Sequence, residues 1–347
     1  MNAVKYFIPL LFLAMVPLGF AWGSAWPFLA VAALPLCLTV FDWLFGVEPE
    51  IAANTDGMRY RMLPWLYIPL QIATTGWAAV AISRPAVTLL EGVGLTLSVG
   101  LTAGIFGMLA AHEMVHSSRP VERALGLTML AGVCYMQFRI AHIYGHHIHA
   151  ATLRDSATAR RGENAYRFVL RSVRGQLREA WSHEAARLRH RGLSAFGPSN
   201  RMLQYFAVEG ILVLGVACLG TRALVFFVAQ SILAIVLLEL FNYIAHYGLV
   251  RVALPSGGRE RLGSRHSWNS SRRMNNWSLF NMGRHSDHHR VTARHYQCLE
   301  PMPNAPELPT GYAGAILLAL VPPLWTQIMD PKAEAWTTRP PNADEIQ

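Results

Sequence analysis

Nine of the fourteen histidines fall into four clusters along the chain, and the spacing within the clusters suits metal binding. Imidazole is a common ligand of zinc, copper, iron and nickel. Nine imidazoles are too many for one ion, so the sequence predicts two metal ions. The nine candidate ligands are His112, His116, His142, His146, His147, His246, His285, His288 and His289.

The spacing inside the clusters indicates how these side chains would face the metals. His112 and His116 are four residues apart, which places both imidazoles on one face of a helix. His146 and His147 are adjacent, so their side chains point apart and could serve different ions. A single histidine near a helix end is more often a hydrogen-bonded structural residue, but nine in four clusters are hard to explain in that way.

Carboxylates are expected beside the ligands, because neutral imidazoles leave the charge of two dipositive ions largely uncompensated. Asp287 and Glu113 are candidates by position, and an ordinary solvated charge is the alternative, a weaker one for Asp287. Glu239 shares a helix face with Asn242 and His246. An ionisable residue inside a membrane span usually faces the bundle interior, so we expect Glu239 to support the ligands or handle protons. A purely structural hydrogen-bonding role is its alternative.

The remaining histidines lack partners at ligand spacing. His149, His183, His190 and His295 are interpreted as loop histidines in basic surroundings, and His266 is an intermediate case.

The elements that must position these side chains are apolar helices. Of the 347 residues, 52% are hydrophobic and 15% are charged, whereas an average soluble domain is about 25% charged. Apolar runs near twenty residues suit a hydrocarbon layer about 30 Å thick. The sequence therefore predicts an all-α, polytopic integral membrane protein and argues against a soluble globule or a disulfide scaffold. The predicted transmembrane spans are 4–22, 26–45, 63–83, 88–111, 203–219 and 223–245.

The positive charge of the chain is concentrated beside these spans. The net charge is +9, and of 30 lysines and arginines 12 lie in residues 139–201 and 9 in residues 251–300. Cytoplasmic loops of membrane proteins collect positive charge in this way, and no nucleic-acid-binding motif is present. The four cysteines are far apart, with no CxxC pair.

With the arginine-rich loops and the N-terminus inside, the fourth and sixth spans bring their histidines to the same face. Residues 124–138 are too few for a full span and are expected to form a buried or re-entrant half-span. All four clusters then meet at one cytoplasmic end. We expect residues 1–347 to form a single membrane-embedded domain, with cytoplasmic histidine-rich regions 112–201 and 246–300.

Two local features complete the expected architecture. Gly100 and Gly104 form a GxxxG pair with Gly107 beyond it. This pattern favours close helix packing, and space for an apolar substrate is the alternative. The Pro-rich tail, 300–310 and 330–347, is expected to be irregular.

The HxxxH, HxxxHH and HxxHH clusters among membrane spans resemble those of the integral-membrane di-iron hydroxylases and desaturases. Within that group the chain is most similar to the membrane alkane 1-monooxygenases and their xylene-monooxygenase relatives. Three stretches carry the resemblance: 146–160, with ATLRD and ATAR; 242–248, with NYIAHYG; and 266–289, with HSWNS and RHSDHH. The motif-level similarity covers roughly residues 105–300.

The resemblance implies that the nine histidines bind two iron ions as a non-haem di-iron centre. It also implies hydroxylation by O2 of a terminal or benzylic methyl group of an apolar hydrocarbon, such as a medium- or long-chain alkane. Glu239 stands where this family usually has a glutamate. Ala141 and Ala245 stand where alkane hydroxylases commonly have an acidic residue, which leaves the xylene-type branch open.

Electrons must come from another protein, because the chain has neither a GxGxxG motif nor a cysteine set for an iron–sulfur cluster. The resemblance implies a rubredoxin or ferredoxin-type carrier with its NAD(P)H reductase. A basic cytoplasmic face would attract such an acidic carrier, although the positive-inside bias alone could also produce that face. The expected location is the bacterial inner membrane, with the metal site on the cytoplasmic side.

Three alternatives remain: a closely related enzyme and two proteins of other classes. A fatty-acid or lipid desaturase would use similar metals, but the HYG and HSDHH elements weigh against it. Residues 112–116 read HExxH, the signature of a zinc protease with Glu113 as its base. An intramembrane protease of this kind needs three ligands and leaves six histidines unexplained. A metal transporter would place its ligands along a pore at mid-membrane.

Overall fold

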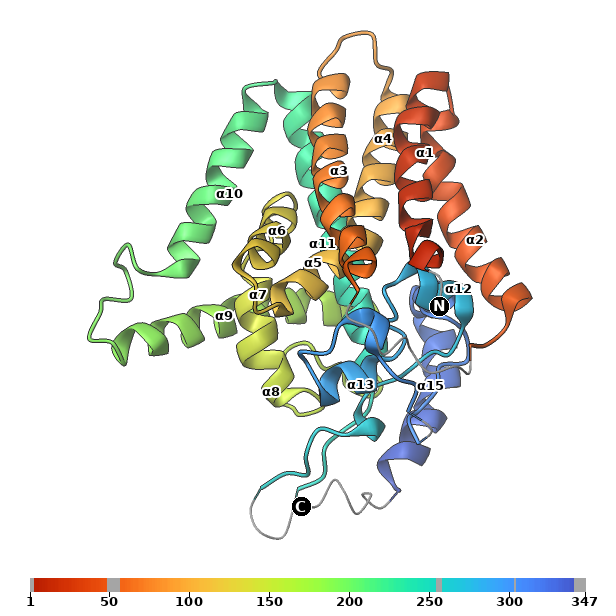
Figure 1. The fold of residues 1–347 in the computed structure, drawn as a ribbon, viewed down its shortest axis with the longest axis vertical. Coiled ribbons are helices and arrows are strands. Elements are labelled where there is room, and N and C mark those ends of the chain that lie inside the picture. The colour runs from red at the N-terminus through yellow and green to blue at the C-terminus, as the bar shows by residue number, and fades with distance from the viewer. Residues whose placement is uncertain (1–2, 49–56, 254–257, 303, 340–347) are drawn as a thin grey trace.

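The computed structural model describes residues 3–48, 57–253, 258–302 and 304–339. Within these ranges every regular element is a helix, and extended backbone pairs only in isolated bridges such as Val47 with Arg272. The all-α prediction is confirmed (Figure 1).

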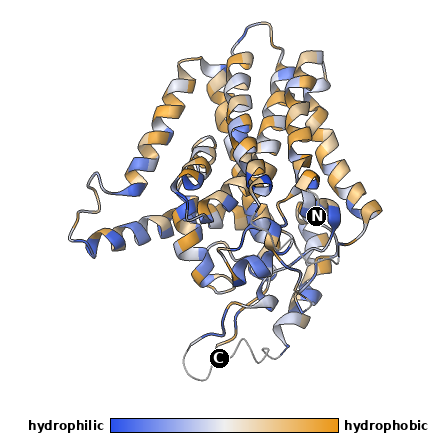
Figure 2. Cartoon of the chain, viewed as in Figure 1, coloured by the Kyte–Doolittle hydropathy of each residue, from blue (hydrophilic) through white to orange (hydrophobic). Residues whose placement is uncertain are grey.

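Five helices in the described ranges are long and apolar enough to cross a membrane. They are Ala3–Trp22 (η1 and α1), Trp26–Phe45 (η2 and α2), Met58–Ile82 (α3), Leu89–His116 (α4, η3 and α5) and Thr221–His246 (α11). The remaining predicted span, 203–219, corresponds to α10 (Arg201–Ala217), whose 17 residues extend about 26 Å. Figure 2 shows apolar residues along the upper helices and polar residues at the lower end of the molecule.

The continuous spans contain short irregular turns, and shorter helices gather around their lower ends (Figure 1). The parts of the spans are η1 (Ala3–Phe7), α1 (Ile8–Trp22), η2 (Trp26–Phe28), α2 (Leu29–Phe45), α4 (Leu89–Thr102), η3 (Ala103–Gly107) and α5 (Met108–His116). The shorter helices are α6 (Pro120–Ala131), α7 (Phe138–Ala141), η4 (His142–His146), α8 (His147–His149), α9 (Ala165–Arg189), η5 (Ser264–His266), α12 (Arg273–Ser278), α13 (His285–Arg290), η6 (Tyr296–Cys298), α14 (Tyr312–Ala319) and α15 (Pro322–Thr337).

Polar side chains begin several of these helices by satisfying their free backbone N–H groups. Thr88 and Glu91 form a reciprocal capping box at the start of α4. Asn164 accepts from Arg167 N at the start of α9, and Asn200 accepts from Met202 N, 2.7 Å away, at the start of α10. These two caps fix the residues at which α9 and α10 begin.

Glycines bring the fourth span into contact with α11. A Cβ atom added at Gly100 would lie 2.9 Å from Leu233 Cδ2, and one added at Gly104 would lie 2.8 Å from Ala234 Cα. The missing side chains therefore allow the two helices to touch. The close-packing interpretation of the GxxxG pair is confirmed, and it is the last turns of these two helices that carry His112 and His246.

The expected half-span corresponds to α6, whose 12 residues extend about 18 Å and are too few to cross a bilayer. The segments on either side of α6 return to the same place, because His116 Nε2 and His142 Nε2 are 3.1 Å apart. The N-terminal end of the first span reaches this end of the molecule as well, since Asn281 Nδ2 donates to Tyr6 Oη at 2.8 Å.

The described residues of 300–310 form no helix, as predicted, but the prediction of an irregular tail was wrong for residues 330–337. Helix α15 continues through Pro331 to Thr337, because Trp325, Met329 and Ala333 form a buried stripe at intervals of four residues. This packing outweighs the hydrogen bond that a proline inside a helix forfeits. The end of the predicted tail, 340–347, lies outside the described residues.

Candidate metal centre

The structure gathers all nine candidate histidines into two adjacent groups. In each group, ring nitrogens from every member lie within 4.8 Å of one another. Group A consists of His112, His116, His142, His147 and His288. Group B consists of His146, His246, His285 and His289. The groups are neighbours, because the rings of His147 and His289 have centroids 4.7 Å apart.

Group A is built from α5, the turn η4–α8 and α13. The Nε2 atom of His116 is 3.1 Å from those of both His142 and His147, which are themselves 2.9 Å apart. The rings of His112 and His288 lie against this triangle, with centroids 4.6 Å apart.

Group B joins η4 to the end of α11 and to α13. The Nε2 atoms of His246, His285 and His289 form a second triangle with sides of 3.1–3.2 Å. His146 completes the group, and its ring centroid is 4.8 Å from that of His246. The side chains of all four histidines are buried.

A π-helical turn explains how one cluster supplies both groups. In η4 the backbone N–H of His147 bonds to the carbonyl of His142, five residues earlier. This wider turn places residues five apart above one another, so His142 and His147 face the same group. His146, one residue earlier, turns towards group B. Another π-helical turn, η3, stands in the span that carries His112 and His116.

The donor set fits metal ions better than it fits hydrogen bonding. A neutral imidazole nitrogen is either a donor or an acceptor, so three nitrogens that face one another cannot all be paired. Two nitrogens bound to one ion at right angles, with bonds of about 2.1 Å, would be about 3.0 Å apart. In addition, His146 Nε2, His288 Nε2 and both ring nitrogens of His112 are buried without a hydrogen-bond partner among the described residues.

The protonation state also suits metal binding. Burial, reinforced by the positive charge that neighbouring imidazoles would carry, lowers the pKa of five candidate ligands outside the spans well below the usual histidine value. These are His142, His147, His285, His288 and His289. They are therefore neutral near pH 7, which is the form in which imidazole binds a metal.

The carboxylate that touches a ligand is Asp155, which was not among the predicted site residues. Its Oδ2 atom accepts from His146 Nδ1 at 2.8 Å, and the hydroxyl of Thr158 and the N–H of Ala157 also bond to this side chain. Burial alone would raise the pKa of Asp155, but His146 and these hydrogen bonds lower it. A signal for this role was present in the sequence, because Asp155 stands in the ATLRD stretch that follows His146–His147.

A second chain of contacts supports His246. Its Nδ1 atom donates to the main-chain carbonyl of His266 at 3.0 Å. The ring of His266 in turn bonds through Nε2 to Glu260 Oε1 at 2.8 Å and through Nδ1 to the N–H of Gly263. His266 is thus a supporting residue rather than a ligand, and the arrangement fixes its tautomer with the proton on Nε2.

Glu239 is buried close to the centre but lies outside both groups. Its carboxylate accepts from Tyr135 Oη at 2.9 Å, from Ser172 Oγ at 2.6 Å and from Gln176 Nε2 at 2.9 Å. The ring of Tyr135 stacks on Phe138, which stacks on the ligand His142 with centroids 4.7 Å apart. Glu239 therefore reaches group A only through other side chains.

The other predicted carboxylates face away from the ligands. Asp287 is fully buried, and its oxygens accept from Arg290, from Arg294 and from the N–H of Glu300 at 2.9 Å. It neutralises arginines and ties α13 to the following loop, instead of contacting a ligand histidine within the described chain. The reason is geometric, because Asp287 leaves α13 on a different face from His285, His288 and His289.

Glu113 likewise bonds to a residue outside the two groups. Its Oε1 atom lies 3.2 Å from His295 Nδ1 and 3.3 Å from the N–H of Tyr296. None of His295, His149, His183 and His190 belongs to the two groups. The prediction that all four lie in loops was wrong for His149 and His183, which lie in α8 and α9.

Comparisons with known proteins agree with this architecture. Residues 86–313 match the model of the fatty acid desaturase family. Alkane 1-monooxygenase 1 of Pseudomonas aeruginosa is 38% identical over 97% of this chain and 93% of its own length. Alkane 1-monooxygenase 2 of the same organism is 36% identical over 95% of this chain and 92% of its own. The xylene/toluene monooxygenase hydroxylase component of Pseudomonas putida is 28% identical over 98% of this chain and 91% of its own.

Proposed function

Because the chain belongs to the alkane 1-monooxygenases within the fatty acid desaturase family, we propose that it hydroxylates an apolar hydrocarbon at two iron ions held by the nine histidines. It is an oxidoreductase and a multi-pass membrane protein. The observation that carries the proposal is the division of the nine histidines into two adjacent groups of ring nitrogens, each suited to one ion. We assign one iron to group A and the other to group B.

The proposed reaction converts a hydrocarbon C–H bond into C–OH. One oxygen atom of O2 enters the product and the other leaves as water, with two electrons and two protons consumed. The iron pair, when bound, would supply the chemistry that activates O2. The protein's residues hold the ions and fix the ring orientations through Asp155 and the His266 carbonyl. The rings of Phe138 and Phe241 lie against His142 and His285 and help to exclude water.

A cavity of about 20 Å³, large enough for about one water-sized group, lies beside the centre. It lies between α2, the fourth span, α11 and α14, and Leu38, Gly104, Leu109 and Phe241 are among its walls. Phe241 reaches the centre, because its ring centroid is 5.7 Å from that of His285. We propose that this cavity takes the terminal or benzylic methyl group of the substrate next to group B, and that the rest of the hydrocarbon reaches it from the bilayer between these helices.

Three further assignments complete the proposal. Residues 1–347 act as one hydroxylase domain, which agrees with the contact between Tyr6 and Asn281. The protein lies in the bacterial inner membrane with its metal centre facing the cytoplasm, in keeping with the arginine-rich loops. A rubredoxin or ferredoxin-type protein, reduced by an NAD(P)H reductase, delivers electrons at that face.

The geometry disfavours the zinc-protease alternative. A zinc protease uses the glutamate of HExxH as a general base beside its metal, but Glu113 bonds to His295 and Tyr296 instead. A single three-ligand site would also leave most of the two groups without an ion.

The decisive measurement is the metal content per chain of detergent-purified protein, followed by product analysis. We expect about two irons and little zinc, and alcohol products from n-alkanes or xylene with a reduced carrier. One zinc without iron would overturn the proposal. An unsaturated acyl product with no alcohol would move the assignment to a desaturase.

A paired substitution tests the ligand assignment. His246→Ala should abolish hydroxylation and remove iron from group B, whereas His183→Ala, outside both groups, should retain both ions and activity. Comparable activity in the two variants would refute the assignment.

A further inference from the structure

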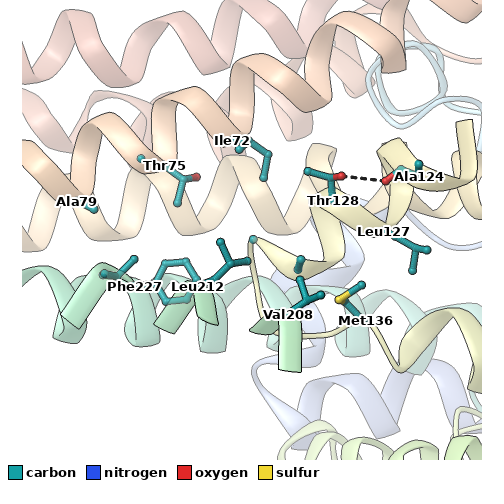
Figure 3. Close-up of a pocket in the computed structure, with 14 residues that line it drawn as sticks. Ile72, Thr75, Ala79, Ala124, Leu127, Thr128, Met136, Val208, Leu212 and Phe227 are labelled. Carbon is teal, nitrogen blue, oxygen red and sulfur yellow. Dashed lines mark hydrogen bonds between the residues drawn. The ribbon is translucent and has the colours of Figure 1, made fainter. Parts of the chain in front are cut away.

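A second apolar cavity lies on the other side of the bundle, between α3, α6, α10 and α11 (Figure 3). Its volume of about 460 Å³ falls within the range of about 300–1,000 Å³ that is usual for small-ligand sites. Met136, one of the lining residues, lies two positions before Phe138. Because Phe138 then stacks on His142, buried side chains separate this cavity from the histidine groups.

The walls offer no free polar group to a ligand. The hydroxyl of Thr75 donates to the carbonyl of Gln71, and that of Thr128 donates to the carbonyl of Ala124, both at 2.9 Å. The other lining side chains are hydrocarbon or the thioether of Met136. Water and polar ligands would lose hydrogen bonds here, so the walls select a hydrocarbon chain.

The cavity is elongated and opens towards the lipid. On α10 it is lined by Val208, Leu212 and Val216, which span about 12 Å along the helix axis. Val208 and Leu212 are 42% and 39% exposed, so the mouth lies on the outer surface of the bundle. A chain lying along this groove would run parallel to the spans, as the acyl chains of a bilayer do.

Positive charge lies just beyond one end of the groove. Ala79 of α3 and Phe227 of α11 line that end, and each is five residues from an arginine, Arg84 or Arg222. Arg222 donates to the carbonyl of Arg84 at 3.0 Å, so the two cations belong to one corner of the molecule. A phosphate at the membrane surface would be attracted there.

We propose that this cavity is a binding site for one acyl chain of an anionic phospholipid, whose phosphate lies beside Arg84 and Arg222. The lipid fills the groove between α10 and the rest of the bundle and thereby completes the packing of α10. The site is distinct from the cavity at Phe241 that we assign to the hydrocarbon substrate.

Photo-cross-linking tests this proposal in the full-length protein. Vesicles of phosphatidylethanolamine and phosphatidylglycerol would carry a phosphatidylglycerol with a diazirine at the middle of one acyl chain, and mass spectrometry would locate the label. We expect the label on peptides that contain 124–132 and 208–216. Labelling spread evenly over the exposed faces of α1 and α2 would overturn the proposal.

Gly76 allows the cavity to be filled from within, because a Cβ atom added there meets nothing within 4 Å. Gly76→Leu should reduce the label at these peptides about tenfold by steric exclusion. Gly215→Leu is the matched control, since Gly215 lies on α10 outside the lining and a Cβ there is equally unobstructed. If Gly76→Leu does not fold, Ala124→Phe at the other end serves instead. Unchanged labelling in the cavity-filling variant would refute the site.

Removing the positive charge of Arg84 tests whether the bound chain belongs to an anionic phospholipid or to a free hydrocarbon. Arg84→Gln should weaken the labelling by phosphatidylglycerol about fivefold and leave that by a neutral phosphatidylcholine analogue unchanged. If added n-hexadecane displaces the label and Arg84→Gln has no effect, the cavity takes free hydrocarbon and the phospholipid assignment is wrong.

Discussion

The ligand histidines differ in what holds the ring nitrogen that faces away from the metal groups. His146 is held by Asp155 and His246 by a main-chain carbonyl. By contrast, Nδ1 of His147, His285 and His289 is buried without a partner among the described residues. Two rings of group B are therefore fixed before any metal binds, and they orient the rest of that group.

Asp155→Asn should weaken metal binding at group B while sparing group A. The neutral amide oxygen is a weaker acceptor than the carboxylate for the hydrogen bond from His146 Nδ1. Loss of such a partner typically costs about 10–100-fold in metal affinity or activity. We expect the iron content to fall from about two to about one per chain, measured by elemental analysis after dialysis. His190→Ala, an exposed histidine outside the groups, is the control. Equal loss of iron from both variants would contradict this role of Asp155.

Glu239 acts as a positioning residue through Tyr135 in our interpretation. Glu239→Gln keeps the shape of the side chain but leaves fewer acceptors for the hydroxyls of Tyr135 and Ser172. Turnover should fall about tenfold with little change in iron content, since this carboxylate touches no ligand histidine. Both quantities can be measured on one preparation, with Glu239→Asp tested for partial rescue. Loss of iron in proportion to activity would instead make Glu239 a structural support of the centre.

Among the helices, α9 and α10 are joined by one buried carboxylate. Glu184 is fully buried and bonds to Arg187 in its own helix and to Arg201 at the start of α10, with Nε of each guanidinium 2.8 Å from Oε2. Burial alone would raise the pKa of Glu184, but the arginine hydrogen bonds outweigh it and lower the pKa to about 2. The ion pair thus anchors the lower end of α10, the helix with the fewest buried residues among the spans.

Glu184→Gln should lower the Tm at pH 7, because charged hydrogen bonds contribute about 1.5–3 kcal/mol. The folded-state pKa lies below the ordinary glutamate value of 4.5, so the stabilisation is complete above about pH 5 and is lost as the pH falls towards 2. The Tm difference between the variant and the parent should therefore narrow below pH 4.5. Glu334→Gln, which removes an exposed pair with Arg161, should change the Tm little. A Tm difference that is constant with pH would contradict the ion-pair explanation.

The clustering of the nine histidines and the helical spans could be predicted from the sequence because both depend on local spacing. The i, i+4 pair at His112 and His116 and the long apolar runs need no knowledge of the chain path. The division of the second cluster could not be predicted, since it depends on the π-helical turn η4, which has no simple sequence signal. The contact of Asp155, rather than Asp287, with a histidine of the two groups could not be predicted either. It depends on how the loops next to α13 and η4 fold.

Considered as a whole, the molecule uses its C-terminal helix to support the centre. Trp325 of α15 is fully buried against Tyr243 and Tyr247, with ring centroids 5.3 and 5.2 Å away. These tyrosines flank His246 in sequence, and Tyr247 Oη also donates to Asp330 of α15 at 2.6 Å. Helix α15 therefore packs against the segment that presents His246 of group B.

Trp325→Ala should destabilise the fold and release metal from group B before group A. Truncation of a buried tryptophan typically costs about 3–5 kcal/mol, and the cavity would let the segment 243–247 shift. The Tm measures the loss of stability. The iron content per chain, measured at increasing chelator concentration, shows how easily the metal is released. Trp43→Ala, which alters a side chain that is 77% exposed, is the control. Retention of both ions at parental chelator resistance would contradict the supporting role of α15.

The order of the ligands along the chain has a consequence for how the centre is made during synthesis. By the time residue 147 has left the ribosome, four of the five members of group A exist, whereas group B has only His146. Groups A and B are both completed by α13, after the last span has been inserted. A nascent chain therefore holds an open, partly formed first group and almost no second group, so stable loading of the proposed metal pair has to follow the synthesis of α13.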